Sequence, residues 1–235
     1  MAIASLPSAG AVEEVAEAIA GSGIRTFVDM STSPPSLARR LAGDLDATGI
    51  EMLDAPVSGG PHGAIARTLA VMVGGNEDIF AREEGLLRDV GAQLVVRVGG
   101  PGAGQTVKLC NNLVAGSTMA ALAEACAIAE REGINAATLY DVLTASTADS
   151  RVVRVRFPLP GVDAAHPSSS EYEPLFALDM IVKDLALACE LAEERGVTPS
   201  VAAAALDEYR RAQAAGHGSL DYSAVYLTQG EESPS

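Results

Sequence analysis

The sequence is short of positive charge. Its 235 residues include 16 lysines and arginines against 31 aspartates and glutamates, which gives a formal net charge of −15. Nucleic acids and anionic membrane surfaces bind proteins through basic patches, so we expect neither as a partner. A small anionic substrate is still compatible with this composition, because a few local cations are enough to bind it.

Cysteine is also rare, and its spacing argues against the common cysteine-based sites. No two of the three cysteines form a CxxC pair, and each lies in an apolar segment with helical spacing: Cys110, Cys126 and Cys189. We therefore expect core packing rather than a zinc site or a disulfide. Free thiols, and no export signal at the first residues, predict a cytoplasmic protein.

Long lipid-spanning runs and the familiar catalytic motifs are absent as well. The most apolar helical stretch, residues 113–129, is rich in alanine and contains Ser117, Thr118 and Glu124. This favours a helix buried between protein surfaces over a membrane span. The chain has no GxSxG, Walker or HExxH motif. Its three histidines share no spacing with each other or with carboxylates, so we expect no metal site.

Lysine occurs only twice, as Lys108 and Lys183, whereas 14 residues are arginines. Arginine can replace lysine on a solvated surface, but it does not titrate and is no compact point charge. Two interpretations follow. Either a compositional bias left two lysines by chance, or both positions require an amine.

Short apolar segments alternate with amphipathic helical segments over the first hundred residues. Strands are expected in "MAIASLP", "TFVDMSTSPP", "EMLDAPVS", "TLAVMVGG" and "QLVVRVGG", with helices from Ser8, from Pro35 and over 78–89. This alternation predicts a parallel α/β layer. After "GGPGAG" we expect helices only, over 105–131, 136–148, 179–195 and 199–214, and a loop over 158–174. The predicted fold is α/β over residues 1–102, followed by an all-helical domain over 103–230.

The long helix carries the first candidate pair. Lys108 and Asn112 are four residues apart, so they share one side of the helix. An amine beside an amide can hold and protonate an oxygen that gains negative charge. A capping lysine and a solvated asparagine explain the same spacing. Lys183 poses a similar choice, since it and Asp184 form either an exposed ion pair or part of a cleft that also contains Phe176.

Glycine-rich turns after the expected strands are the second candidate feature. Ser58, Gly59 and Gly60 follow one strand directly and could present a hydroxyl and open backbone amides to a carboxylate. A turn that requires positive φ explains the two glycines equally well. Ser31 and Thr32 end another strand, where open α/β sheets bind their ligands.

Four motifs together resemble the β-hydroxyacid dehydrogenase family in order and spacing: "VDMSTSPP", "DAPVSGG" with "MVGG", "GAGQTVKLCNN" and "FALDMIVKDLALA". They cover essentially the whole chain. The runs "PLPGV" and "LDYSAV" resemble the family's 3-hydroxyisobutyrate branch. The resemblance implies a partial Rossmann domain for a nicotinamide dinucleotide, NAD with NADP left open, and a helical substrate domain.

The same resemblance implies a role for each candidate residue. Lys108 would be the catalytic acid/base at a primary hydroxyl that becomes an aldehyde, and Asn112 would orient the substrate. Ser58, Gly59 and Gly60 would hold the substrate carboxylate. Leu6, Pro7 and Thr32 would line the dinucleotide, and Lys183 would lie at the edge between cofactor and substrate. Both lysines thus fall on motif positions, and the long apolar helix makes a homo-oligomer the expected state.

Two departures from the family pattern shape the expected function. Arg67 stands where the family usually has glycine, and no GxGxxG turn precedes "MAIASLP". Two βα units and a third strand, roughly 60 to 70 residues at ~30 per unit, are expected to be missing from the Rossmann domain. We therefore expect an exposed apolar edge strand and weak NAD binding. The alternatives to 3-hydroxyisobutyrate oxidation are a non-catalytic remnant acting as an interaction module, or a reductase of tartronate or succinic semialdehyde or of glyoxylate.

Overall fold

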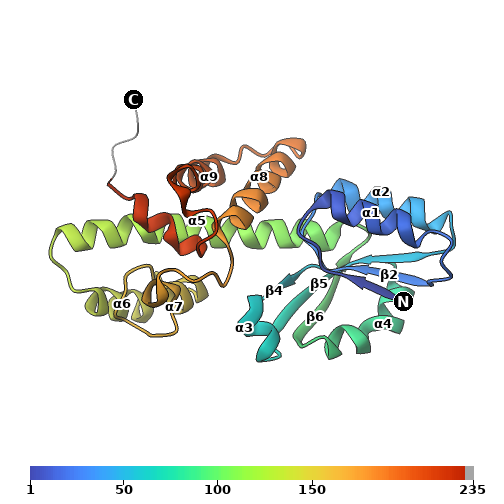
Figure 1. Ribbon diagram of the computed structural model, residues 1–235, viewed down its shortest axis with the longest axis horizontal. Coiled ribbons are helices and arrows are strands. Elements are labelled where there is room, and N and C mark those ends of the chain that lie inside the picture. The colour runs from blue at the N-terminus through green and yellow to red at the C-terminus, as the bar shows by residue number, and fades with distance from the viewer. Residues whose placement is uncertain (231–235) are drawn as a thin grey trace. The chain divides into compact units, whose positions relative to one another are not determined.

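The computed structural model describes residues 1–230 and divides the chain into two compact units, Met1–Asn111 and a second that begins at Asn112 (Figure 1). The first unit is an α/β layer, as predicted. Its strands are β1 (Ala2–Ala4), β2 (Thr26–Asp29), β3 (Glu51–Asp54), β4 (Val57–Ser58), β5 (Leu69–Gly75) and β6 (Ala92–Gly99). Its helices are α1 (Ala9–Ile19), α2 (Pro35–Asp46), α3 (Gly60–Ile65), α4 (Glu77–Asp89) and the start of α5 (Ala103–Arg131).

The six strands form one sheet in which parallel pairing dominates. β1 pairs with β2, β2 with β3 and β5 with β6 in parallel, whereas β3 and β4 both pair antiparallel with β5. The run "EMLDAPVS", predicted as a single strand, is therefore two strands that are separated by Ala55 and Pro56. Pro56 accounts for the break, because proline has no N–H to donate to a ladder. β1 lies at one end of the sheet, where Ile3 is 43% exposed.

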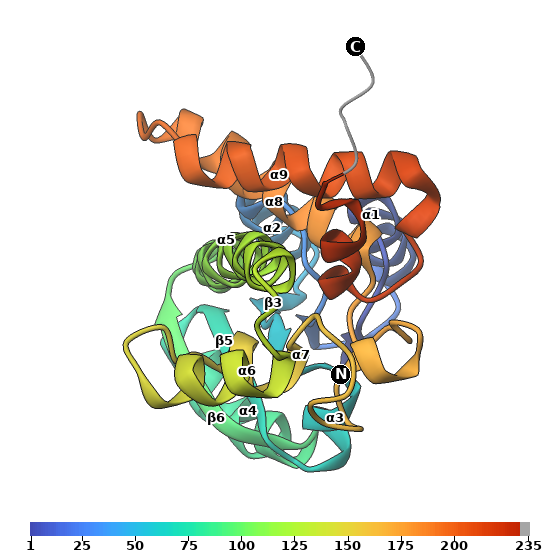
Figure 2. The same cartoon turned by 90° about the vertical axis from the view of Figure 1, so that its left-hand side faces the viewer.

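Each face of the sheet packs against helices, because successive strand residues point to opposite sides. Phe27 and Met52 pack with α1 and α2, whereas the neighbouring Val28 and Leu53 pack with α4 through Leu87. Figure 2 shows α1 and α2 on one side of the strands and α4 on the other. The arrangement is a helix–sheet–helix sandwich, and it leaves the carboxyl ends of β1, β2 and β3 at one edge of the sheet.

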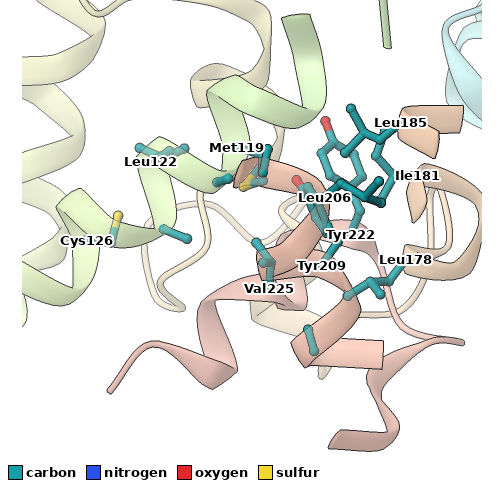
Figure 3. Packing of buried hydrophobic residues seen from close by; sticks show 14 of the residues in the cluster. Met119, Leu122, Cys126, Leu178, Ile181, Leu185, Leu206, Tyr209, Tyr222 and Val225 are labelled. Carbon is teal, nitrogen blue, oxygen red and sulfur yellow. The ribbon is translucent and has the colours of Figure 1, made fainter. Parts of the chain in front are cut away.

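The second unit is helical. Besides the rest of α5, it contains α6 (Ala136–Ala145), α7 (Arg151–Arg156), α8 (Leu178–Glu194) and α9 (Ser200–Ala212), with a π turn over Gln213–His217 and 3-10 helices η1 (Pro167–Ser170) and η3 (Tyr222–Thr228). The core gathers around α5, α8, α9 and η3, where Met119, Leu185 and Tyr209 are fully buried (Figure 3). Three short helices were not predicted: α7, η1 and η3. The first is a single turn and a half, and η1 lies in the segment 158–174 that was expected to be a loop.

α5 is also long and apolar enough to cross a membrane by length and composition, with a mean hydropathy of 1.4 over its most apolar stretch. Half of that stretch is buried inside the protein. A core helix meets the same criterion, and the packing of Met119 and Cys126 in the second unit agrees with the predicted burial between protein surfaces.

Candidate active site

Two neighbouring loops at the sheet edge carry the predicted cofactor residues of the first unit. Leu6 and Pro7 follow β1, and Thr32 follows β2. The backbone N–H of Leu6 donates to Ser31 Oγ at 2.8 Å, which joins the two loops. Thr32 is half-buried beside this contact, and Pro7 is exposed. Because β1 and β2 are parallel neighbours, the fold brings these three predicted residues to one edge.

Asp54 ends β3 and holds the start of α5. Its Oδ1 accepts from the N–H of Gly102 at 2.8 Å, and its Oδ2 accepts from the N–H of Gln105 at 3.0 Å. The side chain is 2% exposed, and burial raises its pKa to about 6. The two N–H bonds act in the opposite direction, and the charge of Asp29, the partner of Asp54 across the β2–β3 ladder, adds to the rise.

Gln105 lies in the first turn of α5 and connects it to the loop after β2. Its side chain is fully buried; Oε1 accepts from the N–H of Ser33 at 3.1 Å, and Nε2 donates to the carbonyl of Ser31 at 2.9 Å. Lys108 follows three residues later on the same helix and is only 7% exposed. Lys108 is therefore a buried residue inside the helix, in contrast to the capping lysine that was the alternative.

The turn that contains Ser58, Gly59 and Gly60 joins β4 to α3. Gly59 has a φ of 136° and Gly60 a φ of 61°, values that side chains rarely adopt. A Cβ at Gly59 would also lie 2.9 Å from Leu69 Cδ2. The backbone therefore requires both glycines, whatever they bind, and Ser58 is half-buried beside them.

In the second unit, one buried carboxylate binds two predicted site residues. Asp184 is 1% exposed; its Oδ2 accepts from Asn112 Nδ2 at 2.5 Å, and its Oδ1 lies 3.0 Å from Lys183 Nζ. The ion pair proposed as one alternative for Lys183 and Asp184 is thus present, but it is not an exposed one, since its carboxylate is buried. The solvated-asparagine alternative fails too, because Asn112 is 5% exposed.

Phe176 belongs to a second buried cluster, which is centred on Asp221. The N–H groups of Leu175 and Phe176 each donate to Asp221 Oδ2 at 3.1 Å, and Arg156 Nε lies 3.3 Å from the same oxygen. Asp221 Oδ1 accepts from the N–H and the hydroxyl of Ser223, at 3.1 and 2.7 Å. This cluster fixes the backbone that leads from Phe176 into α8.

Several of these residues escaped the sequence-based prediction: Asp54, Gln105, Arg156 and Asp221. Asp54 and Gln105 lie inside recognised motifs, at the end of an expected strand and at the start of an expected helix, which was a usable signal. Arg156 and Asp221 are 65 residues apart, and nothing in local spacing predicts their contact.

The donors at the sheet edge suit part of a dinucleotide. Backbone groups and the Thr32 hydroxyl can bind a ribose or an amide-bearing ring. A pyrophosphate is usually held by a glycine-rich turn at a helix N-terminus, and residues 1–230 contain no GxGxxG. Among these residues there is also no group of three or more His, Cys, Asp or Glu side chains placed to hold a metal ion.

Comparisons with known proteins agree along the whole chain. A family model for the NAD binding domain of 6-phosphogluconate dehydrogenase matches residues 1–100. A second model, described as "NAD-binding of NADP-dependent 3-hydroxyisobutyrate dehydrogenase", matches residues 102–228. The two models thus divide the chain near the start of α5.

Individual relatives point the same way. The probable 3-hydroxyisobutyrate dehydrogenase of Mycobacterium tuberculosis is 38% identical over 86% of this chain and 68% of its own length. L-threonate dehydrogenase of Cupriavidus necator is also 38% identical, over 86% of this chain and 65% of its own length. A solved structure titled M. tuberculosis 3-hydroxyisobutyrate dehydrogenase with L-serine has a TM-score of 0.89 at 36% identity, covering 97% of this chain and 78% of that one.

Proposed function

The chain belongs to the β-hydroxyacid dehydrogenase family, and on that premise we propose that it oxidises 3-hydroxyisobutyrate to its semialdehyde. The family makes it an oxidoreductase of hydroxy acids that uses NAD or NADP. The substrate is the proposed part. It is supported by relatives with that name and by the structure titled with L-serine, which is itself a 3-hydroxy acid.

Lys108 is the proposed catalytic residue. A bound dinucleotide would supply the acceptor for the hydride that leaves the hydroxyl-bearing carbon. The amine of Lys108 takes the hydroxyl proton as the C–O bond becomes a carbonyl, and returns it in the reverse reaction. The observation that carries this role is the buried position of Lys108 on α5, one turn before Asn112.

The other site residues have binding roles in this proposal. Asn112, oriented by Asp184, donates to a substrate oxygen, and Ser58 with the amides of Gly59 and Gly60 binds the carboxylate. Leu6, Pro7 and Thr32 contact the dinucleotide. Lys183, which forms an ion pair with Asp184, has its proposed place at the edge between cofactor and substrate.

A second substrate has specific support. L-threonate dehydrogenase is as similar to this chain as the 3-hydroxyisobutyrate enzymes are, at 38% identity over the same share of the chain. L-threonate is a longer, more polar hydroxy acid. Oxidation of such a sugar acid is therefore the runner-up activity.

The deciding experiment follows the formation of reduced cofactor by absorbance. The purified chain is incubated with NAD or NADP and with 3-hydroxyisobutyrate, L-serine or L-threonate, beside Lys108→Ala and Lys108→Arg. We expect turnover that both variants lower by at least about a hundredfold, because arginine keeps the charge but does not exchange the proton.

Each other result has a distinct meaning. Preference for L-threonate would replace the proposed substrate. No turnover with any pair, in either direction with the corresponding semialdehydes, would contradict the enzyme and support the non-catalytic interaction module. Turnover that survives in Lys108→Arg would remove Lys108 from the proton transfer.

A homo-oligomer in the cytoplasm is the proposed setting. Val114 and Ile128 on α5 are 63% and 64% exposed, and such apolar side chains on one helix suit contact with a second copy. All three cysteines are free, which agrees with a reducing compartment. Light scattering during gel filtration tests the first point, and a monomer at micromolar concentration would contradict it.

A further inference from the structure

We propose that Asp54 and Gln105 are positioning residues that lock the first turn of α5, which carries Lys108, to the loop that carries Thr32. The inference rests on the proposed function for its catalytic meaning, but it concerns contacts within the first unit only. Neither side chain is assigned to substrate or cofactor.

Asp54 supplies hydrogen-bond acceptors for N–H groups at the start of α5. The first N–H groups of a helix have no acceptor within the helix. Here two of them, those of Gly102 and Gln105, donate to the two oxygens of a carboxylate that comes from the end of β3. A negative charge is also favourable at this end of the helix dipole. The strand and the helix are therefore joined by a bidentate contact that is closed to water, since Asp54 is 2% exposed.

The glycines around this contact leave no room for adjustment. A Cβ at Gly104 would lie 2.4 Å from the carbonyl oxygen of Met72, and one at Gly102 would lie 2.6 Å from that of Pro35. On the opposite side, a Cβ at Gly74 would lie 2.4 Å from Asp54 Oδ1. The helix start thus sits against β3, β5 and α2 at the closest distance that backbone allows.

Gln105 connects the first turn of α5 to the two loops that carry the predicted cofactor residues. We call the hydrogen-bonded set formed by Asp54, Gln105 and these segments the block. Its amide bonds both to the carbonyl of Ser31 and to the N–H of Ser33, so it brackets Thr32 on the two sides. Ser31 in turn accepts from the N–H of Leu6. One continuous set of hydrogen bonds therefore runs from β3 through the first turn of α5 to both loops.

The position of Lys108 depends on these contacts of Asp54 and Gln105. It lies three residues after Gln105, nearly one helical turn, so any tilt or fraying of the first turn moves its amine relative to Thr32. A misplacement of about 1 Å at a reacting group can cost a hundredfold in rate. A buried carboxylate and a buried amide that touch no reactant can thus control the proton transfer.

The lysine content of the chain makes a direct test feasible. A trace amount of an amine-acylating reagent labels Lys108 and Lys183, and digestion at arginine separates the two sites for mass spectrometry. Lys183, in the second unit, serves as the internal reference. The variants are Asp54→Asn, which turns one of the two acceptors into a donor, and Gln105→Met, which keeps the length but loses both loop contacts. Asp46→Asn and Gln93→Met, both at exposed positions, are the matched controls.

We expect the ratio of Lys108 to Lys183 labelling to rise about fivefold in each variant, as for the loss of one net hydrogen bond, and to stay constant in the controls. An unchanged ratio in both variants would overturn the proposal. If Asp54→Asn does not fold, Gln105→Met decides alone. A parallel rise at Lys183 would indicate general unfolding and would also count against a local block.

The kinetic readout separates this proposal from the proposed function. If the wild type turns over a hydroxy acid, both variants should lower kcat with little change in the KM for substrate, which a general loss of folded protein would not produce at constant active-site concentration. An altered labelling ratio with unchanged kcat would overturn the positioning role. If the wild type turns over nothing, the proposed function fails, while the labelling ratio still decides whether the block holds Lys108.

Discussion

Asp54 in the first unit and Asp221 in the second are both buried aspartates at the start of a helix, but their surroundings differ. Asp54 accepts from two backbone N–H groups, at the start of α5. Asp221 is the N-cap residue of η3 and accepts from five donors, one of which belongs to the guanidinium of Arg156. Arg156 also stacks on Tyr222, 5.1 Å from the ring centre.

The difference shows that burial alone does not determine how unfavourable a charged carboxylate is inside the protein. At Asp54, the loss of hydration outweighs the two N–H bonds, and the pKa rises to about 6. At Asp221, hydrogen bonds from three backbone N–H groups, a hydroxyl and an arginine replace the lost water. The second unit thus uses its aspartate to fix the chain between Phe176 and Ser223. The first unit accepts an incompletely compensated charge at the helix that carries Lys108.

The largest predicted effect comes from removing Asp221, the aspartate whose charge is well compensated by its donors. Asp221→Ala removes the carboxylate that pairs with Arg156 and accepts from three backbone N–H groups. We expect the free energy of unfolding to fall by about 4 kcal/mol, in the range for removing one partner of a buried ion pair. Urea unfolding followed by circular dichroism measures it.

The matched control is Asp207→Ala, whose side chain is 75% exposed beside Arg210. There we expect a loss of less than about 0.5 kcal/mol, as for exposed ion pairs. A loss below about 1 kcal/mol in Asp221→Ala would mean that its five contacts are not maintained in solution.

The next effect concerns Asp54 and pH. The ordinary pKa is 3.8 and the folded-state pKa is about 6, so the folded protein binds more protons than the unfolded chain between these values. Stability contributed by Asp54 is therefore highest at low pH and falls as pH rises through this window. The difference in unfolding free energy between wild type and Asp54→Asn should shift by roughly 2 kcal/mol against the wild type from about pH 4 to pH 6.

Urea unfolding of both proteins at several pH values tests the sign as well as the size. The variant removes this titration, and carboxylates that do not interact with Asp54 cancel in the difference. A difference that does not change with pH, or that grows in favour of the wild type as pH rises, would show that hydration or further donors compensate the charge of Asp54.

Periodicity in the sequence predicted the long elements of both units. The helices from Pro35, over 78–89, from Gln105 to Arg131 and over 179–195 all form within two residues of the expected bounds. Their apolar faces repeat at helical spacing, and Gly133, with a φ of 73°, ends α5 as expected. These features depend on neighbours within one or two turns, which local patterns report well.

Contacts between distant segments could not be predicted in the same way. The short helix α3 forms in "GPHGAI", where glycine and proline argue against a helix, because tertiary packing against β5 overrides propensity. Asp54 reaches Gly102 across 48 residues, and Asn112 reaches Asp184 across 72. Lys108 and Asn112 were found through motif spacing, but the carboxylates that organise their surroundings were not, since a buried and an exposed aspartate look alike in a sequence.

The smallest predicted effect concerns Arg67, a second position at which the first unit tolerates a locally unfavourable feature. Arg67 has a φ of 57° and follows α3, where Thr68 N–H bonds to the carbonyl of Gly63 and Arg67 N–H to that of Ala64. This is the C-terminal helix motif whose left-handed position usually takes glycine, so an arginine there carries a local backbone strain.

Replacing Arg67 by glycine should therefore stabilise the protein by up to about 1 kcal/mol, the relief of left-handed strain less the greater entropy of an unfolded glycine. Arg67→Ala keeps the strain and removes the same exposed side chain, so it should change stability little. Thermal unfolding of the three proteins side by side measures the difference. If alanine stabilises as much as glycine, the arginine side chain rather than the backbone carries the cost. If neither variant is more stable than the wild type, the two hydrogen bonds of the turn compensate the left-handed strain at Arg67. Of the two unfavourable features compared in the first unit, only the buried charge of Asp54 then remains.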